Sequence, residues 1–226
     1  FDDMQNVPKK LRQQMAEKYN CHHMTYDDVQ RSSDGTVKVA FQTADNRVIE
    51  GVIIPAENRL TACVSSQVGC SLNCAFCATG KLKRERNLLA YEIYDQVYDL
   101  NTICHEQFGR GLSNIVFMGM GEPLLNFGEV HRAIDKISAE QGLGMSPKRI
   151  TLSTAGIAKM MEKMADEGAR YHLALSLHAA NDNKRDKIMA INEQNNLERL
   201  KRALVYYYDQ TKERVTFEYI MLKNFN

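Results

Sequence analysis

Residues 114–123 read NIVFMGMGEP, a short apolar run followed at once by glycines and a glutamate. The same order of apolar run and small polar turn returns in ITLSTAG at 150–156 and in HLALSLHAA at 172–180. Between these runs, residues 129–139 and 157–164 have the apolar spacing that is typical of helices. Strands that alternate with helices pair in parallel through right-handed crossovers, so this stretch predicts an α/β fold with a parallel sheet.

The alternation of strands and helices extends on both sides of this stretch. Before it, apolar residues recur at helical spacing from Ile93 to Cys104, and residues 60–65 predict a further strand. After it, residues 197–209 predict a helix, and VTFEYIM at 215–221 predicts a strand. These strands are enough for a partial barrel and too few for a closed eight-fold barrel.

The amino-terminal part of the chain has a different pattern. TVKVAFQTADNRVIEGVII at 36–54 contains two β-rich runs around ADN, which predicts a β-hairpin. Residues 9–19 predict a helix within an otherwise polar and loosely structured segment. We therefore divide the chain into the remnant of an accessory helical domain at 1–33, a hairpin extension at 34–62 and a catalytic core at 63–226.

Composition and charge limit the class of protein to which the chain can belong. Hydrophobic residues make up 44% of the 226 residues and charged residues 25%, as in ordinary globular domains. The sequence shows neither a signal peptide nor an apolar run long enough to span a membrane, so we expect a cytoplasmic protein without a membrane partner. The net charge of +1 does not by itself predict nucleic-acid binding, so an RNA partner would need a local basic patch.

A run of cysteines precedes the predicted parallel strands. Cys70, Cys74 and Cys77 form a CxxxCxxC pattern, and this clustering favours a metal site over a disulfide scaffold. Three thiolates on one loop can hold three irons of a 4Fe-4S cluster and leave the fourth iron open. S-adenosylmethionine can chelate such an iron through its amino and carboxylate groups, after which electron transfer breaks a C–S bond. The alternative is a zinc site that takes Cys63 or a histidine as its fourth ligand.

Small, polar or glycine-rich residues follow each predicted parallel strand. GMGEP follows the run at 114–118, TAG follows ITLS, and HAA follows LALSL. In parallel α/β folds the ligand site forms at the carboxyl ends of the strands. These residues are therefore candidates for the functional site before any family is considered.

Five motifs together resemble one known family. They are VSSQVGCSLNCAFCATG, FMGMGEPLLN, ITLSTAGI, LALSLHAA and VTFEYIML, and they occur in this order within residues 34–226. The cysteine run, with Phe76 before its last cysteine, is similar to that of the radical-SAM superfamily, and the five motifs resemble its RlmN-type adenine methyltransferases. This resemblance implies a partial (β/α)6-type barrel, with a 4Fe-4S cluster and S-adenosyl-L-methionine as cofactors.

The resemblance also implies roles for individual residues. Cys70, Cys74 and Cys77 would ligate the cluster. Glu50 matches the family's proton acceptor, for which a solvated strand glutamate is the alternative reading. Cys63 matches a cysteine that resolves a protein–RNA intermediate, for which a small buried thiol is the alternative, and the resemblance further implies a disulfide bond. The family's cofactor-binding positions fall on Gly121, Glu122, Ser153, Ser176, Leu177 and His178.

The implied activity is methylation of C2 of an adenine in 23S rRNA, and of an adenine next to the anticodon in tRNA, through a methyl-cysteine. Radical chemistry suits this position because C2 of adenine is electron-poor and is not nucleophilic. Two alternatives stay open: the sibling reaction at C8 of adenine, which confers antibiotic resistance, and a zinc-dependent RNA-binding module without catalysis. An electron donor such as flavodoxin and a monomeric state are also expected.

Basic residues directly after the cysteine run are candidates for contact with RNA. Lys81, Lys83, Arg84 and Arg86 form this run, and Lys-Arg at 148–149 precedes another predicted strand. Such runs can track a phosphate backbone and give a salt-dependent affinity. A solvated surface is the alternative reading for both groups.

The sequence departs from the family's pattern in two respects. Ala190 stands where the family has a proline, in a stretch similar to IMPIN, and this change affects only loop geometry. The methyl-carrying cysteine and a further cofactor-binding asparagine of the family would follow Asn226, as in a core truncated at its carboxyl end. We therefore expect residues 1–226 alone to assemble the cluster without methylating RNA.

Overall fold

The computed structural model describes residues 1–20 and 22–225, so Cys21 and Asn226 lie outside the described residues. Its α-helices are α1 (Lys9–Lys18), α2 (Ala90–Phe108), α3 (Phe127–Ser138), α4 (Ala158–Asp166), α5 (Asp182–Ile188) and α6 (Leu197–Thr211). Its strands are β1 (Met24–Arg31), β2 (Val37–Thr43), β3 (Val48–Ala56), β4 (Arg59–Cys63), β5 (Gln67–Val68), β6 (Arg86–Asn87), β7 (Asn114–Phe117), β8 (Ile150–Thr154), β9 (His172–Ser176) and β10 (Val215–Glu218).

Most of the described strands form one sheet in the order β1-β2-β3-β4-β7-β8-β9-β10. Neighbours from β4 to β10 pair in parallel, whereas neighbours from β1 to β4 pair antiparallel. The α/β fold with a parallel sheet, which the alternation around residues 114–123 predicted, is therefore confirmed. The predicted hairpin at 36–54 is present as β2 and β3, and it continues the parallel sheet.

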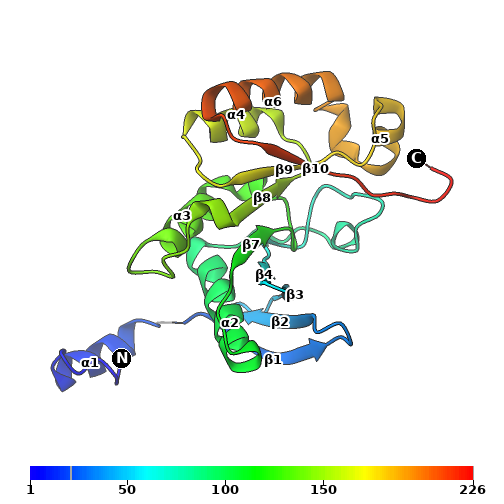
Figure 1. Ribbon diagram of the computed structural model, residues 1–226. Helices are drawn as coiled ribbons and strands as arrows, with labels where there is room; N and C mark the ends of the chain where they lie inside the picture. Colours follow the sequence, from blue (N-terminus) through cyan, green and yellow to red (C-terminus); the bar gives the residue numbers. More distant parts are fainter. Residues whose placement is uncertain (21, 226) are drawn as a thin grey trace.

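Helices α2, α3, α4 and α6 cover one face of the sheet, and their apolar sides enclose the main core (Figure 1). Alternate strand residues point into this core, such as Ile115 and Phe117 of β7 or Leu173 and Leu175 of β9. Because side chains alternate across a strand, the intervening residues point to the opposite side. We call this side, formed by the intervening residues of β2 to β10, the open face.

The pairing of the strands shows that the open face is continuous from the hairpin to β10. Cys63 of β4 pairs with Val52 of β3, and Ser176 of β9 pairs with Glu218 of β10. Paired residues point to the same side of a sheet, and Glu50 lies two residues before Val52. The open face therefore joins Glu50 to the carboxyl ends of the parallel strands.

Three segments differ from the sequence prediction. β1 lies in the stretch predicted to be loosely structured, because MTYDDVQR is mostly polar and its strand is formed through pairing with β2. α5 was not predicted, because its seven residues, DNKRDKI, are too few and too polar to show a helical period. β10 ends at Glu218 rather than at 221, although the apolar pattern continues beyond it.

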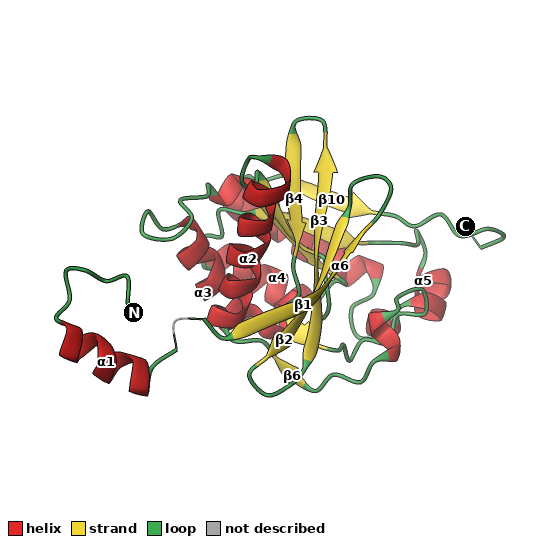
Figure 2. Cartoon of the chain, turned by 90° about the horizontal axis from the view of Figure 1, so that it is seen from below, coloured by secondary structure: helices red, strands yellow, loops and turns green. Residues whose placement is uncertain are grey.

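Two features lie outside the main core. α1 contains no buried residue and lies apart from the rest of the chain in both views (Figure 1, Figure 2). An apolar groove of about 650 Å³ runs along β10 and α6 and is lined by residues such as Leu204, Val205 and Phe217. Among the described residues, no helix combines the length and the apolar composition that a membrane span requires.

Candidate functional site

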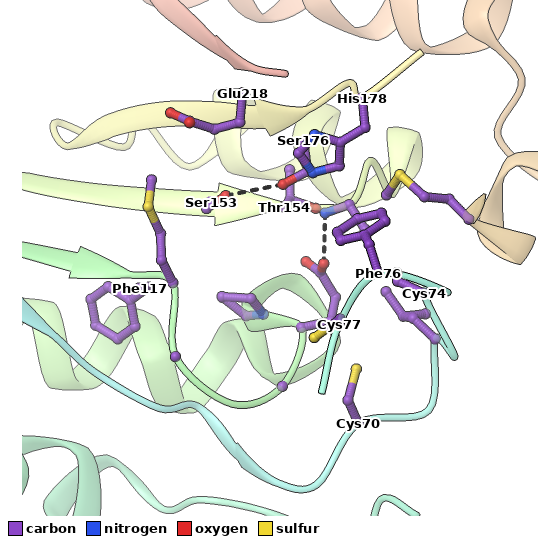
Figure 3. Close-up of a pocket in the computed structure, with 18 residues that line it drawn as sticks. Cys70, Cys74, Phe76, Cys77, Phe117, Ser153, Thr154, Ser176, His178 and Glu218 are labelled. Carbon is purple, nitrogen blue, oxygen red and sulfur yellow. Dashed lines mark hydrogen bonds between the residues drawn. The ribbon is translucent and has the colours of Figure 1, made fainter. Parts of the chain in front are cut away.

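A cavity of about 300 Å³ lies at the carboxyl ends of the parallel strands (Figure 3). The cysteine loop, residues 70–77, contributes one side, and the turn after β7 and the ends of β8, β9 and β10 contribute the others. The cavity brings together most of the site residues predicted from the sequence. These are Cys70, Cys74, Cys77, Gly121, Glu122, Ser153, Ser176 and His178.

Backbone hydrogen bonds give the cysteine loop its shape. Asn73 has a left-handed backbone with φ 50°, which asparagine adopts more readily than most residues. The Cys77 N–H donates to the Cys74 carbonyl at 3.1 Å, and the Ala75 N–H donates to the Ile188 carbonyl at 2.9 Å. The loop is therefore folded back on itself and attached to the end of α5.

The three cysteines of this loop fit a 4Fe-4S cluster. Cys70, Cys74 and Cys77 are half-buried free thiols that line one cavity. Burial, together with the charges of neighbouring thiolates and Glu122, raises the pKa of Cys70 and raises that of Cys74 to about 11. Bound iron would offset this unfavourable charge.

The spacing of the possible ligands bears on the choice between a cluster and a single ion. Within the described part of the chain, no three His, Cys, Asp or Glu side chains converge as the ligands of one metal ion do. A cluster does not need such convergence, because each thiolate binds a different iron. The geometry therefore lends no support to the zinc site that the sequence left open.

Glu122 is buried in the wall of the cavity and joins two loops. Its Oε1 accepts a hydrogen bond from the Leu124 N–H at 3.0 Å, and its Oε2 accepts one from the Ala155 N–H at 2.7 Å. Burial raises the pKa of this carboxyl group, and the hydrogen bonds oppose the rise. Glu122 thereby fixes the turn after β7 against the loop after β8.

Gly121 is required both by backbone conformation and by space. Its φ of +95° is a left-handed conformation that residues with a Cβ rarely adopt, and an added Cβ would lie 2.5 Å from the Gln67 Cβ. The Gln67 side chain in turn accepts a hydrogen bond from the Glu122 N–H at 2.8 Å. Gln67 lies within the quoted motif that contains the cysteine run, but the sequence assigned no role to it, although it holds this turn in place.

The ends of β8 and β9 contribute two serines to the cavity. The Ser153 and Ser176 hydroxyl groups lie 3.5 Å apart, and Figure 3 marks the hydrogen bond between them. Leu177, the residue directly after β9, lines the apolar groove beside β10 and not the cavity. The structure therefore separates the Leu177 side chain from the other predicted cofactor-binding residues.

His178 connects the end of β9 with the cysteine loop. Its ring packs edge-on against Phe76, with ring centroids 4.7 Å apart, and its backbone is left-handed with φ 57°. The Nδ1 atom accepts a hydrogen bond from the Ile220 N–H at 3.2 Å, so the proton of the neutral ring is on Nε2. Burial and the positive charge of Arg185 lower the pKa of His178, which keeps the ring neutral at pH 7.

Glu50 and Cys63 lie on the open face and are not among the residues that line the cavity. The Glu50 carboxylate is half-exposed and forms an ion pair with Lys38 at 3.1 Å. Cys63, the last residue of β4, is partly buried, and burial raises its pKa to about 11. The structure thus places both residues on one side of the sheet but at a different position from the cofactor-binding candidates.

The described cysteines are all free thiols. The disulfide bond implied by the resemblance is therefore not found among Cys63, Cys70, Cys74, Cys77 and Cys104. The first of these lies at a strand end, the next three on the cysteine loop, and Cys104 is buried among the apolar side chains of α2.

Arg86, predicted as part of the RNA-contacting run, is used within the fold. Its guanidinium donates to both carboxylate oxygens of Asp45, at 2.6 and 2.9 Å, and to those of Glu92 at 2.7 Å. Lys81, Lys83 and Arg84 are exposed beside the cysteine loop. The basic surface next to the cavity is therefore smaller than the sequence suggested.

The second basic pair lies at the wrong edge of the sheet for contact with the cavity. Lys148 and Arg149 directly precede β8, whereas the cavity lies where β8 ends. Lys148 is also ion-paired with Glu213, and Arg149 donates to the Ser113 carbonyl at 3.4 Å. Both residues are exposed, so this pair fits the solvated surface that the sequence left as its alternative.

Two further residues at the site were missed by sequence reasoning. Glu218 lines the cavity at the end of β10, and the rule that ligands bind at strand ends could have identified it. Arg185 lies on α5, and its fully buried guanidinium donates to carbonyl groups of the loops around the cavity. No sequence signal pointed to it, because an arginine in a polar segment is normally exposed.

Comparison with known proteins shows relatives across the full length of the chain. The family described as the Radical SAM superfamily matches residues 64–226. The chain is 53% identical over 226 residues to the "Probable dual-specificity RNA methyltransferase RlmN" of Christiangramia forsetii, covering 100% of this chain and 64% of that protein. It is 42% identical over 228 residues to the protein of the same name from Thermus thermophilus, covering 100% of this chain and 63% of that protein.

A solved structure has the same fold. The crystal structure of a radical SAM methyltransferase from Sphaerobacter thermophilus superposes with a TM-score of 0.95 at 38% identity, covering 100% of this chain and 66% of that chain. The chain thus spans somewhat less than two thirds of the length of the curated relatives named above.

Proposed function

Because this chain belongs to the radical SAM superfamily, we propose that Cys70, Cys74 and Cys77 hold a 4Fe-4S cluster that acts on S-adenosyl-L-methionine. One observation carries this proposal. Three free thiols on one loop face a buried carboxyl group and two strand-end serines across a single cavity of about 300 Å³. Bound there, the cluster would supply the single electron that breaks a C–S bond of S-adenosylmethionine.

The residues around the cysteine loop would bind and orient the cofactor. Glu122 would accept from the cofactor's amino group, next to the close backbone approach that Gly121 allows. Ser153 and Ser176 offer hydroxyl groups as donors or acceptors, and the neutral ring of His178 offers its Nε2–H. Because backbone hydrogen bonds hold the side chains of Glu122 and His178, and the two serines lie at strand ends, the cofactor meets a site that needs little rearrangement.

We further propose that the substrate is RNA and that the methylated atom is C2 of an adenine in 23S rRNA and in tRNA. The relatives named as dual-specificity RNA methyltransferases support this substrate class. The exposed side chains of Lys81, Lys83 and Arg84 lie beside the cavity and would contact phosphates. The protein would work in the cytoplasm as a monomer, with an external electron donor such as flavodoxin.

Glu50 and Cys63 would act after the methylene carbon of the methyl-cysteine has bonded to C2 of the base. Glu50 would accept the proton that C2 loses. The Cys63 thiolate would then attack the sulfur that carries the RNA adduct, so that a disulfide forms, the S–CH2 bond breaks, and the carbon keeps the electron pair and takes up a proton to become the methyl group. Both residues lie on the open face, where a base could approach from the side opposite the helices. The raised pKa of Cys63 means that the thiol needs a proton acceptor before it can act as a nucleophile.

Cofactor cleavage provides the first test of this proposal. The protein would be purified and reconstituted without oxygen, then incubated with dithionite and S-adenosylmethionine. We expect a brown protein and the formation of 5′-deoxyadenosine. A colourless protein that binds zinc and forms no deoxyadenosine would contradict the proposal.

The base and atom require a separate measurement. Mass spectrometry of rRNA and tRNA from cells with and without the encoding gene would show which methyladenine depends on the protein. 2-Methyladenosine in both RNAs is expected. 8-Methyladenosine would instead identify the sibling reaction at C8.

A further inference from the structure

Arg185 of α5 is fully buried, and its guanidinium contacts neutral groups. It donates to the carbonyl groups of Leu177 at 3.1 Å, Ala155 at 2.6 Å and Ser176 at 3.2 Å, and to the amide oxygen of Asn192 at 2.7 Å. A buried cation normally pairs directly with an anion, because burial otherwise leaves its charge uncompensated. The position of Arg185 therefore needs an explanation beyond local packing.

The hydrogen bonds of Arg185 connect the two loops that line the cavity. Ala155 belongs to the loop after β8, and Ser176 ends β9. Ala155 also donates its N–H to Glu122, so one guanidinium, one carboxyl group and three loop segments form a connected network. A change at Arg185 would therefore reach Glu122 through a single residue.

The same helix supports the cysteine loop. Ile188 and Met189, one turn after Arg185, pack against Leu72, Cys74 and Phe76. The Ala75 N–H donates to the Ile188 carbonyl at 2.9 Å. Arg185 thus belongs to the helix whose last residue is hydrogen-bonded to the loop that bears the three cysteines.

Two acidic residues, Asp182 and Asp186, lie near Arg185 but do not contact its guanidinium directly. Asp182 and Asp186 accept hydrogen bonds from the Asn192 amide nitrogen at 2.9 and 2.7 Å, and Asn192 separates them from the guanidinium. On the other side, Arg185 donates to the carbonyl groups of Ala155 and Ser176, and both of these residues line the cavity. Arg185 therefore places a positive charge next to residues of the cavity lining without being part of it, opposite in sign to the carboxylates of Glu122 and Glu218.

We propose that Arg185 is a positioning residue whose buried positive charge makes the cluster on Cys70, Cys74 and Cys77 easier to reduce. This inference rests on the proposed function, since it requires that the cluster is bound. Reduction adds one electron and hence one unit of negative charge to the cluster, with no bond in the protein formed or broken. A fixed positive charge in a buried environment stabilises the reduced form more than the oxidised form, and net charge is one of the properties that set cluster potentials.

The test is a reductive titration of the reconstituted protein with dithionite, followed by the electron paramagnetic resonance signal of the reduced cluster. Arg185→Gln removes the charge and keeps a hydrogen-bonding amide. At a fixed solution potential we expect about tenfold less reduced relative to oxidised cluster, which for one electron is a shift of 59 mV to more negative potential. Arg185→Lys keeps the charge but loses the planar fork, and we expect a potential close to that of the unaltered protein.

Two control variants keep the test decisive. Arg199→Gln removes an arginine that is ion-paired with Glu162, outside the cavity lining, and should leave the potential unchanged. Asp186 is exposed, and its side-chain oxygen accepts a hydrogen bond from Asn192. The substitution Asp186→Asn keeps a side-chain oxygen at this place and removes the negative charge. It should shift the potential in the less negative direction, and it decides the question if Arg185→Gln does not fold.

The outcomes separate this inference from the proposed function. If the unaltered protein binds no cluster, the proposed function fails. If the cluster forms and its potential is the same with Arg185→Gln, or falls equally with Arg185→Lys, the charge of Arg185 does not set the potential and the inference is overturned. If Arg185→Gln does not fold, an unchanged cluster potential in Asp186→Asn would overturn the inference.

Discussion

The two ends of the open face differ in how firmly the fold holds their polar side chains. At the carboxyl ends of the parallel strands, Glu122 is buried and accepts hydrogen bonds from two backbone N–H groups. At the hairpin, Glu50 is half-exposed and is paired with the exposed side chain of Lys38. One carboxyl group is fixed by the backbone of two loops, whereas the other is free to exchange its partner.

This difference matches two kinds of ligand. A small cofactor gains affinity from groups that are already in place, because little conformational entropy is lost on binding. A base within a folded RNA arrives only after the macromolecule has docked, so a proton acceptor at that end must adjust to it. The cavity end therefore suits the cofactor, and the hairpin end suits the substrate.

The largest effect is expected from the cysteine loop, on which the whole cavity end depends. Cys74→Ala should abolish both iron binding and deoxyadenosine formation, because two remaining thiolates cannot hold the cluster with one open iron. Iron analysis and chromatography of the products measure these effects. Cys104→Ala, in the core of α2, is the matched control and should retain the iron. Full iron content in Cys74→Ala would remove the cluster assignment.

The second prediction concerns Glu122, the carboxyl group that two loops hold in place. Glu122→Ala should weaken S-adenosylmethionine binding by roughly 10- to 100-fold, since loss of a buried charged partner costs about 1–3 kcal/mol. The absorption of the cluster should stay unchanged, because Glu122 is not on the cysteine loop. Equilibrium dialysis of the anaerobic protein measures the affinity, and an unaltered affinity would show that the cofactor does not use this end of the face.

Glu50 should affect a later step than Glu122. Glu50→Gln is expected to retain the cluster, cofactor affinity and deoxyadenosine formation, and to lose methyladenine in RNA, because the proton of the adduct would have no acceptor. Expression in cells that lack the native gene, followed by mass spectrometry of their RNA, measures the product. Lys38→Met is the control for loss of the ion pair alone. Normal methyladenine levels with Glu50→Gln would contradict a role as proton acceptor and would favour the alternative interpretation, a solvated strand glutamate.

The exposed lysine and arginine beside the cavity should have a smaller effect, limited to RNA affinity. Neutralising Lys83 and Arg84 together should lower the affinity and flatten its salt dependence by roughly one unit of log–log slope for each lost phosphate contact. Filter binding over a range of salt concentrations measures the slope. Lys148→Gln, at the opposite edge of the sheet, should leave the slope as it was, and an equal loss in both variants would count against a defined RNA surface.

The smallest effect is expected at the turn of the hairpin. Hydrogen bonds from Arg86 and Thr43 hold the pKa of Asp45 well below its ordinary value. A lowered pKa in the folded state stabilises the protein above the unfolded pKa of about 3.9, and this contribution is lost as the pH falls further. Asp45→Asn should therefore lower the free energy of unfolding by about 1 kcal/mol at pH 7. Urea unfolding at pH 7 and pH 3 measures this, and a difference that does not shrink in acid would contradict the ion pair.

The parallel core and most of the cavity could be predicted from the sequence, because both follow from local order. Once NIVF, ITLS and LALSL are strands, the residues at and after their carboxyl ends must meet at one edge, and this holds for Glu122, Ser153 and His178. The sequence could not show that Arg86 forms an ion pair with Asp45. These residues are 41 positions apart, and the fold of the hairpin brings them together.

Burial of polar groups was the least predictable property. Arg185 lies in a polar segment, and its burial depends on carbonyl groups supplied by two distant loops. Gln67 is fixed by the turn after β7, which is 55 positions further along the chain. The side chains of Arg185 and Gln67 both form hydrogen bonds with backbone groups of distant segments. Every residue type has such backbone groups, so the sequence does not show where these partners are.

The left-handed backbone of His178 has a consequence for engineering of this protein. A non-glycine residue in that conformation is about 1–2 kcal/mol less stable than in the right-handed region. Glycine would relieve the strain, but it would remove the ring that packs on Phe76 and accepts from Ile220. Because the lost hydrogen bond costs about 1–3 kcal/mol, it offsets the relief of strain. Melting temperature alone therefore does not report the loss of this ring, and variants at this position have to be ranked by cofactor binding as well.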